Sequence, residues 1–136
     1  MTNENRRANV ALEMDEARRH HAAAVRNAQA GDRETAANRL YFAALHAIKA
    51  VCLTKGLEPK THRGLKSLLV TRFVASGELP AAIETAFAQL ETERDLADYA
   101  TGYRVTPERY EERLAGFNRL LESVESYLRG AGWLGS

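Results

Sequence analysis

Apolar residues recur at intervals of three and four along most of this chain, and this pattern limits the fold more than any other feature. Residues 5 to 30 contain neither Pro nor Gly, and their apolar face is thin and rich in Ala. That face comprises Val10, Met14, Ala17, His21, Val25 and Ala28. No segment of useful length alternates with a period of two, as a strand exposed on one face would. The sequence therefore predicts an all-α protein.

Glycines, prolines and capping residues divide the chain into five helical segments. We expect helices over residues 5–30, 33–55, 80–101 and 107–130, and another that starts at the Thr61 cap and runs to Ser76. Short loops favour antiparallel neighbours, so the expected fold is an antiparallel four-to-five-helix bundle. We expect one domain over residues 1–130 and a short flexible tail over 131–136.

The apolar stripes of these segments predict which side chains form the core. On the second segment the stripe comprises Tyr41, Leu45, Ile48 and Cys52, which indicates burial on one side of that helix. The last segment repeats its apolar residues in near-heptad order. The side chains that we expect to be largely buried are Leu45, Ile48, Leu69, Phe87, Leu90, Phe117, Leu121 and Val124.

Composition excludes several classes of protein. Of the 136 residues, 45% are hydrophobic and 27% are charged, which is typical of a globular domain and not of a disordered chain. No apolar run approaches the ~20 residues of a membrane span. The first residues lack the apolar segment of a secretory signal, so we expect a cytoplasmic protein without a membrane. Cys52 is the single cysteine; its place on the apolar stripe favours a buried hydrophobe over a reactive thiol.

A net charge of +1 conceals two halves of opposite sign. Residues 1–72 hold 13 Lys and Arg against 7 Asp and Glu, whereas residues 73–136 hold 6 against 11. A basic half can attract phosphate groups. The alternative is that oppositely charged helices lie beside each other in a bundle.

The candidate functional residues lie in the stretch Asn38-Arg39-Leu40-Tyr41-Phe42-Ala43-Ala44-Leu45-His46. Arg39 and His46 are separated by about 700° of helical rotation and roughly 10.5 Å of rise, so they share one face. That face would present a permanent cation and a titratable imidazole. The alternative is an Arg near a helix start and a His satisfied within a helix interface.

A second basic group, Lys60-Thr61-His62-Arg63, precedes the third helical segment. Free N–H groups and the helix dipole favour an anion at such a terminus, which makes Lys60, His62 and Arg63 candidates for RNA or nucleotide binding. The alternative is ordinary capping with exposed cations.

Other familiar chemistries are absent from the sequence. It has no glycine-rich phosphate loop, no nucleophile elbow and no Cys/His pattern for zinc. His20 and His21 point about 100° apart on a helix and do not form a metal pair. We therefore expect no metal ligands and no cofactor.

Three ordered blocks resemble the HEPN domain family, especially its small stand-alone prokaryotic members. They are Asn38 to Ala47, which follows Gly31-Asp32; Lys60-Thr61-His62-Arg63-Gly64-Leu65; and Arg94-Asp95-Leu96-Ala97-Asp98-Tyr99. The blocks occur in the family's order, and the resemblance that rests on them covers nearly the whole chain. The resemblance implies a dimeric four-to-five-helix bundle. It also implies an Arg-x4-6-His motif that cleaves RNA without a metal in active members, and Arg39 and His46 fit its six-residue spacing.

Two departures from the family pattern limit what is carried over. Leu40 stands where many active relatives have a polar residue, and Ile48 stands where an antitoxin-regulated subgroup has a Tyr. Modification of that tyrosine is therefore not implied for this chain.

Two functions remain open at this point. The first is a metal-independent, dimeric endoribonuclease of toxin type that acts on RNA through Arg39 and His46, with a nucleotidyltransferase as its antitoxin partner. The alternative is a non-catalytic homodimeric module that pairs with a minimal nucleotidyltransferase or binds a nucleotide. The sequence alone gives neither the RNA target nor the partner.

Overall fold

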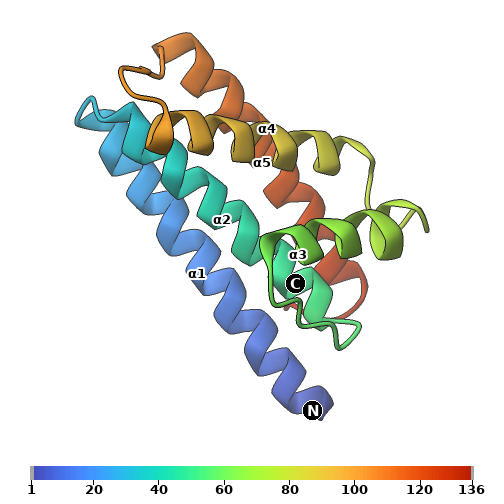
Figure 1. Cartoon of the computed structure of the whole chain (residues 1–136). Coiled ribbons are helices and arrows are strands. Elements are labelled where there is room, and N and C mark those ends of the chain that lie inside the picture. Colours follow the sequence, from blue (N-terminus) through green and yellow to red (C-terminus); the bar gives the residue numbers. More distant parts are fainter. Residues whose placement is uncertain (1, 136) are drawn as a thin grey trace.

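The structure, a computed structural model, describes residues 2–135. Within that range it contains five α-helices and no strand, which confirms the all-α prediction. The α-helices are α1 (Asn3–Gln29), α2 (Arg33–Leu53), α3 (His62–Leu69), α4 (Ala82–Tyr99) and α5 (Pro107–Gly130), and a π-helical turn, η1 (Val70–Val74), follows α3 directly (Figure 1).

The helix starts lie where the capping residues predict them. The side chains of Asp32, Thr61 and Thr106 accept hydrogen bonds from the backbone N–H three residues further along, at 3.1, 2.9 and 3.2 Å. These bonds satisfy donors that have no partner inside a helix. Gly31 and Gly56 have φ of +84° and +69°, a conformation that ends a helix readily only at glycine.

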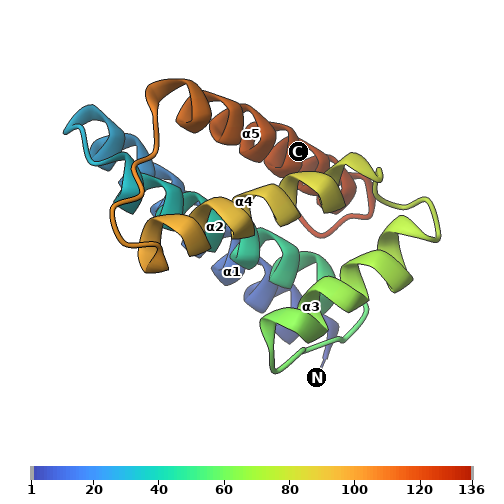
Figure 2. The ribbon, with the colours of Figure 1, turned by 45° about the horizontal axis from the view of Figure 1, so that its top comes forward.

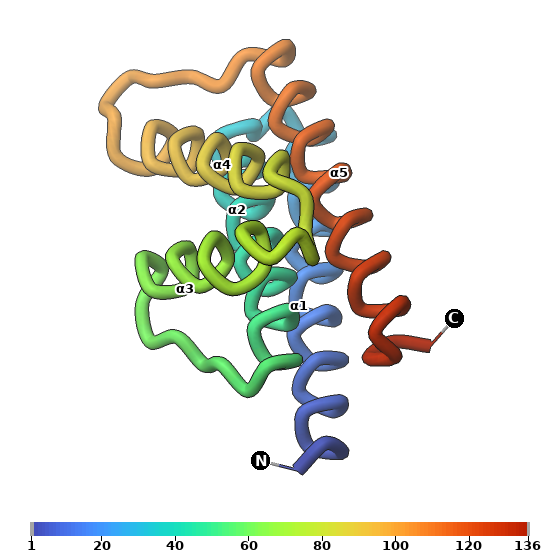
Figure 3. The backbone as a smooth tube through the Cα atoms, turned by 90° about the vertical axis from the view of Figure 1, so that its right-hand side faces the viewer, coloured from blue at the N-terminus to red at the C-terminus, as the bar shows by residue number. Residues whose placement is uncertain are grey.

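Helix α2 lies at the centre of the bundle. It packs side by side with α1, and α3, α4 and α5 also contact it. Figure 1 shows α1 and α2 as an antiparallel pair, and Figure 3 shows α3 and α4 crossing α2 while α5 runs at a steep angle to α4. Figure 2 shows α5 and α4 together over the α1–α2 pair. Four neighbours therefore enclose one helix.

Burial of α2 extends further round the helix than its apolar stripe predicts. Thirteen of its 21 residues are buried, and six of these are alanines. The predicted stripe is buried and Arg39 and His46 keep some exposure. The buried side is wider than predicted because small apolar side chains let neighbouring helices approach closely from several directions. Between residues 35 and 49 the side chains that keep some exposure are Thr35, Asn38, Arg39, Phe42, His46 and Lys49. They share about 100° of the helix circumference, and we call them the open strip.

The core prediction is confirmed at seven of its eight positions. Leu121 is only partly buried, and its neighbour Leu120 is 1% exposed instead. An α-helix drifts by about 20° per heptad relative to an exact seven-residue repeat, so the buried side of α5 moves from one residue to the next. On α1, Val25 is 40% exposed and Ala24 is fully buried in its place.

The segment after α3 also differs from its prediction. The α-helix ends at Leu69 and does not continue to Ser76. Five residues of π-helix follow, and the N–H of Ala75 donates to the carbonyl of Val70 at 2.9 Å. The wider turn keeps Phe73 fully buried against the core.

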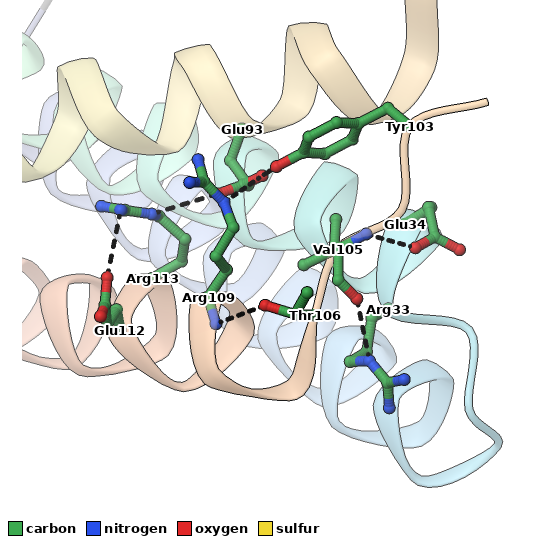
Figure 4. Close-up of polar contacts among 9 residues, drawn as sticks. All are labelled: Arg33, Glu34, Glu93, Tyr103, Val105, Thr106, Arg109, Glu112 and Arg113. Carbon is green, nitrogen blue, oxygen red and sulfur yellow. Dashed lines mark hydrogen bonds and ion pairs between the residues drawn. The ribbon is translucent and has the colours of Figure 1, made fainter. Parts of the chain in front are cut away.

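A buried carboxylate joins α4 to α5. Glu93 is 1% exposed, and Arg109 Nε and Arg113 Nε lie 3.1 and 3.3 Å from its Oε1. The hydroxyl of Tyr103 donates to its Oε2, as Figure 4 shows. Burying the charge of Glu93 away from water costs free energy, and this cost is offset only because three donors surround the carboxylate. Burial, followed by the nearby Glu93, raises the pKa of Tyr103.

The loop between α4 and α5 is also tied to the start of α2. The N–H of Val105 donates to Glu34 Oε2 at 2.7 Å, and Arg33 Nε donates to the Val105 carbonyl at 3.0 Å (Figure 4). Val105 itself is buried. This loop therefore fixes where α5 starts relative to α2.

Two other predictions concern Cys52 and the absence of a membrane span. Cys52 is buried, as predicted, and burial raises the pKa of its thiol to about 11. Such a thiol is a poor nucleophile at neutral pH. None of the described helices combines the length and apolar character needed to cross a bilayer.

Replacing Phe117 by Ala should lower the free energy of unfolding by about 3 to 5 kcal/mol, because the ring is fully buried and its loss leaves a cavity. Urea denaturation measures the change. Tyr99→Ala is the matched control, since Tyr99 is 72% exposed and its loss should change stability by no more than about 0.5 kcal/mol. Equal effects of the two substitutions would contradict the assigned core.

Candidate functional site

Arg39 and His46 both lie on the open strip of α2, and α1 provides the side chains that they contact. Arg39 Nη1 lies 3.3 Å from His20 Nδ1, and His46 Nδ1 lies 3.0 Å from Glu13 Oε2. The rings of His20 and His46 lie with their centroids 5.3 Å apart and their planes 11° apart. His20 therefore bridges the two motif residues.

The contact between Arg39 and His20 determines which form of the imidazole fits. Burial lowers the pKa of His20, and the charges of His46 and Arg39 lower it further. A neutral imidazole carries one lone pair, so Nδ1 of His20 can accept a hydrogen bond from the guanidinium of Arg39. The arrangement keeps the positive charge on Arg39.

The carboxylate of Glu13 holds the ring of His46. The side chains are 26% and 19% exposed, so the pair is partly shielded but open to a ligand. With its Nδ1–H donated to Glu13, His46 keeps Nε2 free to take up a proton. An acidic group that orients an imidazole in this way is a recurrent feature of general acid–base sites.

Pockets adjoin the motif on both sides. One, of about 290 Å³, is lined by residues that include Glu16, Arg19, Arg26 and Arg39. The other, of about 400 Å³, is lined by residues that include Glu13, Lys49 and Lys60. Cations are thus available on either side of His46, an arrangement suited to a chain of phosphates.

The basic group at α3 lies partly against the same face. His62 Nδ1 is 3.0 Å from the hydroxyl of Tyr41, and its ring centroid is 6.3 Å from that of Phe42 on the open strip. Burial raises the pKa of Tyr41 to about 12. Lys60 reaches the motif through the pocket that it shares with Glu13, and Arg63 is exposed. The structure thus brings Lys60 and His62, but not Arg63, into contact with the surroundings of the motif.

The third sequence block, on α4, supports the open strip from the other side. The guanidinium of Arg94 lies 5.4 Å from the ring centroid of Phe42 and 3.3 Å from Asp98, the predicted partner. Asp98 in turn accepts a hydrogen bond of 2.8 Å from Asn38. The Arg94 block therefore positions the residues beside Arg39.

Leu40 is fully buried. It follows Arg39 directly but points about 100° away from it, toward the core. Its side chain therefore takes no part in the open strip.

Sequence reasoning missed the contribution of α1, which is Glu13, Glu16 and His20. These residues fall at spacings of three and four, so they share one face of that helix. That spacing was the sequence signal that these three residues share a face. It could not show that this face contacts Arg39 and His46. The neighbouring His21 points elsewhere and packs against Phe117, with ring centroids 4.8 Å apart.

Comparison with known proteins identifies the family. The model of the HEPN domain matches residues 11–127. The chain belongs to the HEPN family. It is 27% identical over 93 residues to the protein named "Putative toxin MJ0142" from Methanocaldococcus jannaschii. That match covers 68% of this chain and 63% of the archaeal protein, so the chain spans less than two thirds of that relative's length.

Stability should fall as the pH is lowered from about 7.5 to 5.5. The pKa values of His20 and His21 are lowered by burial below their ordinary value of 6.5, so the unfolded chain binds protons that the folded chain does not. The stabilisation is complete above pH 6.5 and is lost as the pH falls through the folded-state pKa values. Urea denaturation at each pH measures the decline.

The double variant His20→Gln and His21→Gln is the control for this pH dependence. It should show a flatter profile over the same interval, because the groups that take up the protons are gone. A wild-type profile without slope between pH 7.5 and 5.5 would contradict the assignment.

Proposed function

We propose that this HEPN protein is a dimeric, metal-independent endoribonuclease of toxin type that cleaves RNA at Arg39 and His46. The observation that carries the proposal is the continuous contact that Arg39 and His46 of the open strip make with His20 and Glu13 of α1. A fixed cation, a titratable imidazole and an orienting carboxylate are the groups that phosphodiester transesterification needs.

The reaction uses the 2′-hydroxyl of the RNA as the nucleophile. His46 Nε2 takes the proton of that hydroxyl, or returns one to the leaving 5′-oxygen, while its Nδ1–H remains bonded to Glu13. The 2′-oxygen forms a bond to phosphorus as the bond to the 5′-oxygen breaks. Arg39 binds the phosphate and stabilises the negative charge that grows on it. Single-stranded RNA suits the site, because its backbone can align for this attack.

One chain offers one Arg39 and one His46, whereas the reaction uses a base, an acid and a phosphate clamp. A two-fold axis next to α2 would bring two motifs to a shared cleft. Two apolar side chains on this side of the molecule support such a contact, namely Phe42 on the open strip and Leu12, which is 60% exposed. Dimerisation and cleavage are then linked.

A binding module without cleavage is the second candidate. Its support is that Arg39 and His46 are each already satisfied within the chain, by His20 and Glu13. In this function the same face binds a nucleotidyltransferase antitoxin or a nucleotide, with Lys60 and His62 as anion-binding residues and Arg63 as an exposed cation next to them in the chain.

An RNA cleavage assay in the presence of a chelator tests the enzymatic proposal. Wild-type protein should cut single-stranded RNA, leave a 2′,3′-cyclic phosphate and leave DNA intact, because DNA lacks the nucleophile. His46→Ala should lower the rate by about 10²- to 10⁴-fold. Arg39→Lys should also lower it sharply, because an ammonium group cannot make the two-pronged phosphate contact.

Arg129→Lys is the matched control, since Arg129 is exposed near the end of α5 and pairs with Glu125. Its cleavage rate should equal that of wild type, and circular dichroism should show that all variants are folded. Undiminished cleavage by His46→Ala would remove His46 from the mechanism. Folded dimer that cuts no RNA but binds a nucleotidyltransferase would favour the second candidate.

The assembly is tested by sedimentation velocity. Wild-type protein at micromolar concentration should sediment as a dimer, and Phe42→Glu should sediment as a monomer with little cleavage, because a charge is placed at the contact. Val25→Glu, which places the same charge at an exposed apolar side chain of α1 outside the open strip, should remain dimeric. A wild-type monomer, or a Phe42→Glu dimer with full activity, would overturn the shared cleft.

A further inference from the structure

Three side chains beside the motif have the composition of a metal site. Glu16, His20 and His46 each offer one ligand atom, and these atoms lie within 4.8 Å of one another. In the part of the chain that the structure describes, no other three His, Cys, Asp or Glu residues group in this way. Two imidazoles and one carboxylate are a ligand set that suits zinc.

Two closely packed helices hold these ligands. Glu16 and His20 are one turn apart on α1, and His46 faces them from α2, the helix that packs along α1. Ligand atoms of a tetrahedral zinc ion lie about 3.3 Å apart, given bonds of about 2.0 to 2.1 Å. An inward movement of side chains by roughly 1.5 Å is enough to reach that geometry, and all three side chains are only partly buried.

We propose that Glu16, His20 and His46 form a binding site for a divalent transition-metal ion of the zinc type. One carboxylate oxygen and one nitrogen of each imidazole are the ligands. A fourth position stays open for water or an anion. This site shares His46 with the proposed cleavage, which itself needs no metal.

The neighbours of these ligands fit the proposal. Glu13 accepts the Nδ1–H of His46 and leaves Nε2 for the metal, an outer-shell contact that is common for metal-bound imidazoles. Glu13 and Glu16 place two carboxylates beside the ligands, and these balance the positive charges of Arg39 and Arg19. Glu16 pairs at 2.6 Å with Arg19, whose side chain is 77% exposed, and such pairs are weak enough to give way.

Binding of the metal competes with the contacts of the motif. The neutral imidazole of His20 has one lone pair, which now accepts from Arg39 at 3.3 Å. A metal ion takes that lone pair, so Arg39 loses its partner and must move. The ion also takes the lone pair of His46 that would serve as the base. Given the proposed ribonuclease function, occupancy of this site therefore inhibits cleavage.

The site itself is tested without RNA. Protein freed of metal with a chelator is titrated with Zn²⁺ by calorimetry and with Co²⁺ by visible absorption, where four-coordinate Co²⁺ gives an intense d–d band. We expect one ion per chain. Glu16→Gln and His20→Gln should each weaken binding at least about tenfold, and Glu13→Gln should weaken it by about 10- to 100-fold as the loss of an outer-shell partner does.

Two substitutions serve as controls for metal binding. Asp15→Asn removes a neighbouring carboxylate that pairs with Arg18, and His62→Gln removes an exposed histidine outside the group. Both should bind Zn²⁺ and Co²⁺ as wild type does. Absence of stoichiometric binding, or affinity that is unchanged in Glu16→Gln and His20→Gln, would overturn the site.

Cleavage in the presence of Zn²⁺ tests the inhibition. Added Zn²⁺ should stop RNA cleavage by wild type, and a chelator should restore it. In Glu16→Gln the Zn²⁺ concentration for half inhibition, measured against the metal-free rate of that variant, should rise at least tenfold. Cleavage that persists in wild type at saturating Zn²⁺ would overturn the inhibitory role. Metal binding by a protein that cuts no RNA would support the site while refuting the ribonuclease, so the two failures are distinguishable.

Discussion

Burial of α2 by the four other helices is the constraint on which the rest of the structure depends. A helix enclosed in this way can place polar side chains only where no neighbour covers it, because an unpaired charge in the core is costly. The gap is the open strip, and both motif residues lie there. Leu40, one residue after Arg39, is already fully buried. The position of the candidate site is thus a consequence of how the core is packed.

Two carboxylates among the described residues, those of Glu93 and Glu13, have different physical roles. Glu93 is enclosed, with three donors around it, so its charge fixes the α4–α5 loop and offers nothing to a ligand. Glu13 is 26% exposed and holds one imidazole. Because the environment of Glu13 is open and its partner is titratable, a substrate can approach His46 without disrupting the core. The difference in burial separates a structural charge from a candidate functional one.

The proposed cleavage and the proposed metal binding both depend on the lone pairs of His46 and His20. In the proposed ribonuclease, His46 uses its free nitrogen for proton transfer, and His20 keeps Arg39 in place. A metal ion takes the same two nitrogens, so the two uses exclude each other. A single set of side chains on α1 and α2 can therefore carry out a reaction and also control it, provided that the HEPN motif of this chain is active.

The sequence by itself determined the helical class, most helix boundaries, seven of eight core positions, and the common face of Arg39 and His46, because caps and periodicity are local properties of the chain. Its resemblance to the HEPN family, carried by three ordered blocks, is confirmed. Tertiary packing decided how far round α2 is buried, the π-helical turn after Leu69 and the burial of Leu120 in place of Leu121. It also decided that Glu13, Glu16 and His20 lie beside the motif. Periodicity states which residues share a face of one helix, whereas the rotation and crossing of two helices decide which faces meet.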